Sequence, residues 1–317
     1  MQSAVKDLQR LGVLGINRRN VDYIRRFNPR RLYPLVDDKL RTKQLAVEAG
    51  MPVPELFAVL STQHDIRDLA DLLGARDQFV VKPAHGSGGN GVLVIKGRRR
   101  DVFFKSSGAP VDRDEMAHHI SNMLSGLYSL GGQRDRVMVE YCVQTAEALA
   151  PMSYRGVPDI RLIVFQGYPV MAMIRLPTRL SDGRANLHQG AVGVGIDIAT
   201  GVTLGGVLDN RCVSEHPDTG QKLAGMVLPA WNQILEMAAQ GYEITGLGYL
   251  GIDIVIDRDL GPLILELNAR PGLSIQIANE AGLQSCLELV QSISNEAASI
   301  VVRLEFCRKH FAVPLPK

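Results

Sequence analysis

The chain is 317 residues long, 46% hydrophobic and 21% charged, which is typical of a soluble globular protein with enough residues for two compact lobes. Its apolar runs have the length of strands, below the roughly 20 residues that a membrane helix requires, and no signal-peptide pattern opens the sequence. These features exclude a membrane-spanning protein and predict a cytoplasmic one. The small net charge of +2 does not by itself favour a nucleic-acid partner.

The positive charge is concentrated in the first part of the chain. Residues 1–45 carry eleven Lys or Arg against four Asp or Glu, so the remainder is acidic. This basic segment, 1–36, predicts either a solvated amphipathic helix around Val21, Ile24 and Phe27 or a surface that attracts nucleic acid or an acidic polypeptide. The arginines concerned are Arg18, Arg19, Arg25, Arg26, Arg30 and Arg31.

The cysteines are widely spaced and form no CxxC pair, which argues against a disulfide framework and against a zinc site. We expect buried free thiols at Cys142, Cys212, Cys286 and Cys307.

The segment 37–142 has the pattern of a small α+β lobe. Asp37 or Asp38 can cap a helix that runs to Ala49, where Gly50 and Pro52 end it. Further helices are predicted over 62–73 and 113–127, and strands over 79–82, 92–95 and 137–142.

The segment 143–317 is richer in strands and has the pattern of a larger lobe. A short turn at residues 166–168 predicts a hairpin between 159–165 and 169–176, and a glycine-rich connection follows. The remaining predicted elements are a helix near 228–240, strands over 249–257 and 262–268, and one long helix from about Gln284. Mixed elements without βαβ alternation indicate an α+β fold.

The glycine-rich stretch 82–91, KPAHGSGGNG, formally matches GxGxxG. A dinucleotide fingerprint or a P-loop would open a helix, whereas these glycines open the β-branched run 92–95. A protein kinase is excluded because Lys82 precedes the loop and no HRD or DFG follows. Two interpretations stay open, a flexible hairpin and a flap whose backbone N–H groups cover nucleotide phosphates.

Two lysines lie near this loop in the predicted lobe. Pro83 keeps the backbone extended, so Lys82 leaves the sheet edge beside the glycines. Lys39 lies at a helix start, where the macrodipole disfavours a cation, so it either extends into solvent or binds an anion.

Polar residues interrupt the last two predicted strands. Along a strand, residues two apart share a face, so Glu266 and Asn268 project together while Leu265 and Leu267 face the core. If the strands are antiparallel neighbours, Asp253 joins them, and the three oxygen donors suit Mg²⁺ rather than zinc. The alternative is a polar strand face paired with nearby Arg or Lys. Arg270 follows and can grip a carboxylate or phosphate.

The motifs occur in an order that resembles the ATP-grasp superfamily: DK, VVKP with the glycine loop, VEYC, DIR, NLHQGA, GIDI and ELNARPG. Within it the chain is most similar to ribosomal-protein glutamate ligases and related α-L-glutamate ligases, over roughly residues 35–285. The resemblance implies two α+β lobes that grip ATP. The separate N-terminal domain of that superfamily is expected to be truncated, since the DK motif already falls at Lys39.

The resemblance also implies roles for individual residues. ATP would be bound by Lys39, Lys82, Gly86, Ser87, Gly88, Gly89, Gly91, Glu140, Tyr141, Asp159, Arg184 and Asn186. Magnesium, as two ions that Mn²⁺ can replace, would be held by Asp253, Glu266 and Asn268. The acceptor or the acyl phosphate would be handled by Arg161, Arg175 and Arg270, although Arg270 stands where the glutamate ligases carry a small residue.

The activity that the resemblance implies is an ADP-forming carboxylate–amine ligase working through an acyl phosphate. It would add glutamate or another amino acid to an amine or peptide acceptor, with an acidic peptide as one candidate. The alternatives are a phosphotransferase or sugar-linked enzyme that stops at phosphoryl transfer, and a non-catalytic nucleotide-binding regulator. A homo-oligomer or a partner protein is expected to supply the wall that the truncated domain lacks.

Overall fold

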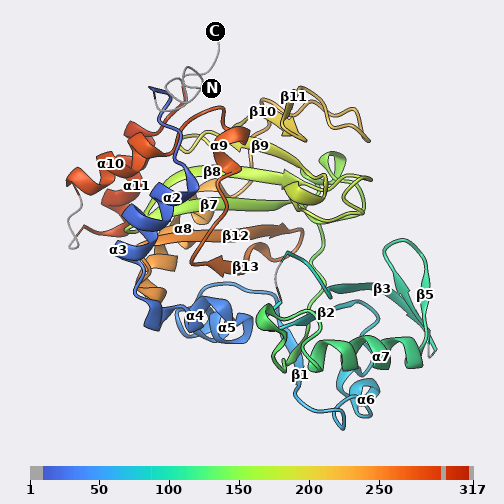
Figure 1. Ribbon diagram of the computed structural model, residues 1–317. Helices are drawn as coiled ribbons and strands as arrows, with labels where there is room; N and C mark the ends of the chain where they lie inside the picture. The colour runs from blue at the N-terminus through green and yellow to red at the C-terminus, as the bar shows by residue number, and fades with distance from the viewer. Residues whose placement is uncertain (1–9, 87, 101, 294–297, 314–317) are drawn as a thin grey trace. The chain divides into compact units, whose positions relative to one another are not determined.

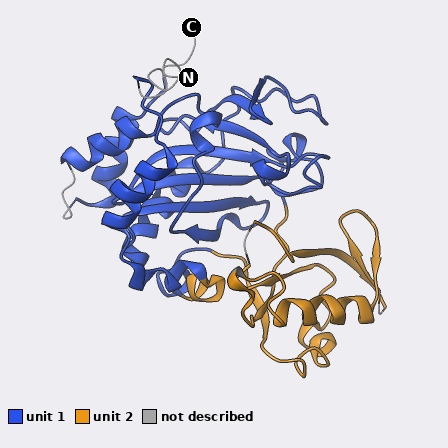
Figure 2. Ribbon diagram, viewed as in Figure 1, with its two compact units in different colours: residues 1–37, 45–52, 145–317 blue, residues 38–44, 53–144 orange. Residues whose placement is uncertain are grey.

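The structure is a computed structural model that describes residues 10–86, 88–100, 102–293 and 298–313. The chain divides into two compact units (Figure 2). Unit 1 comprises residues 1–37, 45–52 and 145–317, and unit 2 comprises residues 38–44 and 53–144. Each unit combines helices with one antiparallel sheet, so the predicted α+β class is confirmed.

Unit 2 is built on a six-stranded sheet in the order β1-β6-β2-β3-β4-β5 (Figure 1). Its apolar face packs against helix α7 (Arg113–Leu124), through Met116, Ile120 and Met123. The predicted strands at 79–82, 92–95 and 137–142 are confirmed, and β1, β4 and β5 are additional. The strands are β1 (Leu56–Leu60), β2 (Phe79–Pro83), β3 (Leu93–Arg99), β4 (Val102–Lys105), β5 (Pro110–Val111) and β6 (Val137–Glu140).

Aspartate side chains cap two helices in this region. Asp38 Oδ1 accepts a hydrogen bond of 2.9 Å from the Leu40 N–H at the start of α5 (Lys39–Glu48), so Asp38 is the cap. Asp112 caps α7 in the same way, accepting from the Glu115 N–H. The helix predicted over 62–73 is shorter, because Thr62 and Asp65 form a closed polar turn and α6 spans Leu69–Leu73.

Unit 1 is built on a seven-stranded antiparallel sheet in the order β11-β10-β9-β8-β7-β12-β13 (Figure 1). The predicted hairpin is confirmed: β7 (Asp159–Phe165) and β8 (Tyr168–Leu176) pair through a two-residue turn in which Gln166 and Gly167 both have positive φ. The predicted neighbours β12 (Tyr249–Asp257) and β13 (Gly261–Asn268) are also antiparallel partners.

The glycine-rich connection predicted after β8 is wrong in part, because it contains three strands of the sheet: β9 (Val192–Ile196), β10 (Thr203–Leu208) and β11 (Arg211–Val213). Glycines break the apolar alternation that marks a strand, so the pattern concealed β9. They are required by packing. A Cβ at Gly195 would lie 2.6 Å from the Ala278 carbonyl oxygen, so α9 (Ile275–Ala278) can approach the sheet closely only over a glycine.

Helices cover both faces of this sheet. The helix predicted near 228–240 is α8 (Trp231–Thr245), and a Cβ at Gly241 would lie 2.4 Å from Ile252 Cδ1, so α8 covers the face to which Ile252 belongs. The single long C-terminal helix is wrong: α10 (Gln284–Ile293) and α11 (Ile300–His310) are separate, and the Ser299 side chain caps α11. Residues 294–297 lie outside the described residues.

The four cysteines are free, as predicted, but they are not all buried. Cys142 and Cys307 are buried and Cys286 is half-buried, whereas Cys212 on β11 is exposed, so the predicted burial is wrong for Cys212. β11 is an edge strand, and its residues Arg211 and Cys212 are both exposed.

The N-terminal segment is helical from Ile16 to Phe27, as α2 (Ile16–Arg18), a π-helical turn η1 (Arg19–Ile24) and α3 (Arg25–Phe27). The predicted apolar side is partly confirmed, since Ile24 is buried while Val21 is 54% exposed. Two short helical turns follow, η2 (Arg30–Leu32) and α4 (Pro34–Asp37). Figure 1 shows α2 and α3 near α10 and α11, at one end of the strands of unit 1.

A buried asparagine fastens this segment to the sheet. Asn28 Nδ2 donates to the carbonyls of Tyr249, at 2.7 Å, and Ala269, at 2.9 Å. Asn28 Oδ1 accepts from the Tyr249 N–H at 2.8 Å. One side chain therefore satisfies three backbone groups, two at the start of β12 and one just after β13.

We expect Asn28→Ala to lower the free energy of unfolding of unit 1 by about 3 kcal/mol, since three buried hydrogen bonds contribute about 1 kcal/mol each. The single tryptophan, Trp231, lies buried in unit 1, so urea unfolding followed by its fluorescence measures this unit. The matched control, Asn17→Ala at an exposed site, should change stability by less than about 0.5 kcal/mol. Equal stability of the two variants would contradict the anchoring role of Asn28.

Candidate functional site

Strand register in unit 1 gathers the polar residues on one face of the sheet. Asp253 on β12 pairs with Arg161 on β7 and with Glu266 on β13. Asp159 on β7 pairs with Arg175 on β8. Since side chains of paired residues lie on the same face and alternate along each strand, all five lie opposite the face that α8 covers.

Four of these side chains form a buried network of ion pairs. Arg161 holds Asp253 with two parallel hydrogen bonds, of which Nη2 to Oδ2 measures 2.6 Å. Arg175 Nη2 lies 3.0 Å from Asp253 Oδ2 and 2.5 Å from Asp159 Oδ2, so it bridges the two carboxylates. For Asp253, the alternative of a strand face paired with arginines therefore describes the structure.

The pKa values of the two carboxyl groups in this network are shifted in opposite directions. Burial alone would raise the pKa of Asp253, but the guanidiniums of Arg161 and Arg175 outweigh burial and lower it. Burial dominates at Asp159, where the neighbouring Asp253 carboxylate adds to it and Arg175 compensates in part, so the pKa of Asp159 is raised to about 6. Burial opposes the charge on Arg175, yet its two carboxylate partners raise its pKa further.

A β-bulge separates Glu266 from Ile264 on β13. Asp253 pairs with Glu266 and the next residue, Ile254, pairs with Ile264, so Leu265 has no direct partner on β12. The predicted core position of Leu265 is wrong, since it is half-buried at the bulge. Glu266 and Asn268 share a face as predicted, because no irregularity separates them.

Asn268 carries a further sign of a binding site. Its Nδ2 atom is buried and has no hydrogen-bond partner among the described residues. Unpaired buried polar atoms are costly, and turning the amide by 180° would present its oxygen at the same position. No three His, Cys, Asp or Glu of the described ranges form a metal-holding group, so an ion here would need the amide oxygen as well.

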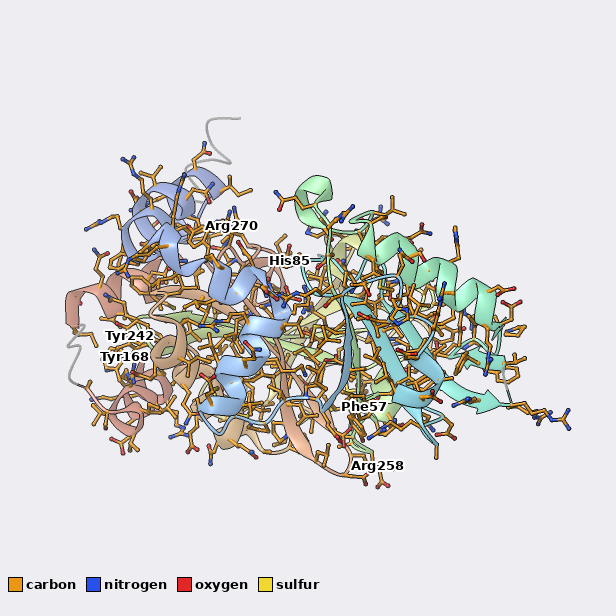
Figure 3. The ribbon with its side chains drawn as sticks, turned by 90° about the horizontal axis from the view of Figure 1, so that it is seen from below. Phe57, His85, Tyr168, Tyr242, Arg258 and Arg270 are labelled. Atoms are coloured by element: carbon orange, nitrogen blue, oxygen red, sulfur yellow. The ribbon has the colours of Figure 1, made fainter. Side chains whose placement is uncertain are left out.

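The other predicted residues of unit 1 lie apart from this network. Arg270 is just past β13 (Figure 3), with its guanidinium over the Tyr33 ring and 3.8 Å from Asp37. Arg184 is exposed in the loop after β8. Asn186 accepts a hydrogen bond of 3.0 Å from the His188 N–H and caps the short helix η5 (Leu187–Gln189).

A second polar cluster lies inside unit 2. Glu140, at the end of β6, is buried between Lys82 Nζ on β2 and Lys43 Nζ on α5, the latter 3.0 Å away. Burial would raise the pKa of Glu140, but the two ammonium groups outweigh it and lower the value. Burial also lowers the pKa of Lys43.

Lys43 was missed in the sequence. Its position four residues after Lys39, one helical turn further, was the available signal, because both then face the same side of α5. Lys43 also donates to the Pro54 carbonyl, so its ammonium is held from two sides.

The glycine loop is fixed at its base and open at its tip. Lys39 Nζ donates to the Gly86 carbonyl, so Lys39 does not simply extend into solvent. Gly88 and Gly89 are exposed and have positive φ, and Gly91 accepts a 3.0 Å hydrogen bond from His119 Nε2 on α7. Ser87 lies outside the described residues. Tyr141 follows β6, and its N–H bonds the Glu55 carbonyl at 2.8 Å.

The order of these elements and the two antiparallel sheets define an ATP-grasp protein. A family model described as sugar-transfer associated ATP-grasp matches residues 18–292. The match covers most of the chain, so the chain belongs to this family.

Curated relatives match the chain at low sequence identity. A probable alpha-L-glutamate ligase of Citrobacter koseri is 26% identical over 272 residues, which is 86% of this chain and 66% of the relative. A second one, of Maridesulfovibrio salexigens, is 25% identical over 74% of this chain and 56% of its own length. A ribosomal protein bS6 L-glutamate ligase of Escherichia fergusonii is 24% identical, with 86% and 66% coverage. The chain thus spans less than two thirds of these relatives.

Among solved structures, a D-alanine-D-alanine ligase from Bacillus anthracis complexed with ATP is similar over 88% of this chain and 70% of the ligase chain. The TM-score is 0.46 and the identity 14%, so the family assignment rests on the family model. Within the described ranges, no helix is both long and apolar enough to cross a bilayer.

We expect Glu140→Gln to destabilise unit 2 by about 3 kcal/mol or more at pH 7, because it leaves two buried ammonium groups without a counter-ion. The folded pKa of Glu140 is lowered, so its stabilisation is complete above the unfolded pKa of about 4.3 and is lost as the pH falls through the folded value. The difference between wild type and variant should therefore shrink on acidification.

Hydrogen-exchange protection of the β2 and β6 amides between pH 7 and pH 3 measures this difference. The control is Glu48→Gln, at an exposed position of α5, which should leave that protection unchanged. A destabilisation by Glu140→Gln that stays constant across the pH range would show that the carboxylate charge is not its cause.

Proposed function

We propose that the chain is an ATP-dependent carboxylate–amine ligase that works through an acyl phosphate. The observation that carries the proposal is the single face of the unit 1 sheet on which Asp253, Glu266 and Asn268 lie beside Arg161 and Arg175. Membership of the ATP-grasp family supports ATP as the phosphoryl donor. The names of the curated relatives support amino-acid ligation.

The reaction brings a carboxylate against a triphosphate, so cations must offset the repulsion. In the proposal Lys39 and Lys82 bind the phosphates, and the loop that carries the exposed Gly88 and Gly89 folds over them and excludes water. Glu140 and Tyr141 would contact the base, and Asp159, Arg184 and Asn186 the rest of the nucleotide. Because the Glu140 carboxylate is held by Lys43 and Lys82, its backbone is the group left to contact adenine.

The oxygen donors on the sheet face fit magnesium. Glu266 and Asp253 supply carboxylates and Asn268 an amide whose buried nitrogen has no described partner. Bound Mg²⁺ would neutralise phosphate charge and orient the phosphate oxygens. Two ions, or Mn²⁺ in their place, belong to the proposal as well.

Arg161 and Arg175 would have two sets of partners. In the structure they neutralise Asp253 and Asp159. When Asp253 is shared with a cation, the guanidiniums can turn part of their hydrogen bonding to the anionic acyl phosphate. Arg270, exposed beyond β13, is then placed to bind the acceptor.

The second candidate is phosphoryl transfer without amide formation. The description of the family as sugar-transfer associated favours it, since it names no amine ligation. The same cations would serve, because both reactions begin with transfer of the terminal phosphate. The two candidates differ in product: an amide and phosphate for the ligase, a phosphorylated substrate for the transferase.

Substrates and partners also belong to the proposal. The relatives are named for adding glutamate, in one case to a ribosomal protein, which supports an amino-acid or peptide carboxylate and an amine or acidic peptide acceptor. A homo-oligomer or a partner protein belongs to the proposal as well, and so does a cytoplasmic location.

We expect Glu266→Ala to lower ATP-dependent turnover about a hundredfold or more, the effect of removing one preorganised electrostatic group. The measurement is ADP release with a panel of amino acids and peptides, with Glu236→Ala, exposed on α8, as the control. Wild-type turnover in Glu266→Ala would refute the proposed metal site.

Hydroxylamine separates the two candidate reactions. An acyl phosphate reacts with it to give a hydroxamate, whereas a phosphate ester does not. We expect wild type to form a hydroxamate from the activated acid, detectable by mass spectrometry, in amounts that follow ADP. ADP release with a phosphorylated product and no hydroxamate would favour the transferase.

A further inference from the structure

A buried carboxylate lies directly behind the glycine loop of unit 2. Asp135, whose side chain is fully buried before β6, accepts hydrogen bonds from the His85 N–H at 3.0 Å and from the Ser129 hydroxyl at 2.5 Å. It also accepts from the Arg136 N–H at 2.7 Å and from His85 Nδ1 at 2.7 Å. These bonds outweigh burial and lower the pKa of Asp135, so the carboxylate is ionised.

This geometry fixes the state and direction of the His85 ring. An ionised carboxylate accepts hydrogen bonds and donates none, so Nδ1 must carry a proton. Nε2 then points away from Asp135 and is the atom left for a ligand. The side chain is 40% exposed two residues after the end of β2, and His85 is labelled in Figure 3.

The charges around the ring balance when the imidazole is neutral. Asp38 lies 3.8 Å from Nε2, but its Oδ2 atom is paired with Arg136 at 2.5 Å and its Oδ1 atom caps α5. Lys39 reaches the carbonyl of Gly86, the residue after His85. The two carboxylates of Asp38 and Asp135 thus offset the two cations Arg136 and Lys39. A second proton on His85 would give this group of side chains a net positive charge.

We propose that His85 is a further phosphate-binding residue, which Asp135 orients and which takes up a proton when the terminal phosphates of the nucleotide bind. The inference rests on the proposed function, because it takes the glycine loop to cover phosphates. His85 Nε2–H would donate to a phosphate oxygen beside Lys39 and Lys82. Asp135 acts through His85 and is a positioning residue.

Calorimetric titration with a non-hydrolysable ATP analogue, ADP and AMP in the presence of Mg²⁺ tests the proposal. We expect His85→Gln to weaken binding of the triphosphate analogue about tenfold at pH 6.5 and to leave AMP within about twofold. Titration in buffers of different ionisation enthalpy should show proton uptake by wild type that His85→Gln lacks. Asp135→Asn should also weaken binding of the triphosphate analogue and lower the proton uptake. His118→Gln, exposed on α7, should behave as wild type.

The outcomes are distinct. Equal triphosphate affinity and equal proton uptake in wild type and His85→Gln would overturn the inference while leaving the proposed function intact. An equal loss for AMP and for the triphosphate would also overturn it, since that result indicates a structural role. Failure of wild type to bind any of the three nucleotides would overturn the proposed function and the inference together.

Discussion

Charge burial is the constraint on which both polar clusters depend. A carboxylate removed from water costs several kcal/mol unless cations and hydrogen bonds replace the water. Asp253 meets this requirement through two guanidiniums, and Glu140 through two ammonium groups. In each unit the charged groups therefore hold one another in place, so the chemistry-bearing side chains are ordered before any ligand arrives.

Sequence patterns predicted the elements whose signals are local. The turn at Gln166 and Gly167 and the polar positions in β12 and β13 are local patterns, and each was found as predicted. The strand β9 was missed because glycine supplies no alternation, and its role depends on α9, some eighty residues later. The prediction of one long C-terminal helix is wrong because the Ser299 side chain accepts from the Val302 N–H and so begins a separate helix.

Site residues could be proposed from the sequence, but their partners could not. Pairing of Arg161 with Asp253 depends on the register of two strands ninety residues apart, which no local pattern contains. Asp135 was missed for the same reason, since it matters through a neighbour distant in sequence, whereas Lys43 had a local signal in its helical spacing from Lys39. The predicted ATP and magnesium ligands stay predictions, whereas the network that connects Asp159, Arg161, Arg175 and Asp253 is a finding of the structure.

The bulge at Leu265 has an evolutionary consequence. It uses one extra residue so that Ile264 and Leu267 face α8 while Glu266 and Asn268 face the other side. Deletion of one residue within β13 would remove the bulge or shift the strand register by one residue. Such a shift moves side chains to the opposite face of the sheet. Length variation among descendants of this chain should therefore be suppressed in β13 and tolerated in the exposed turn at residues 258–260 that precedes it.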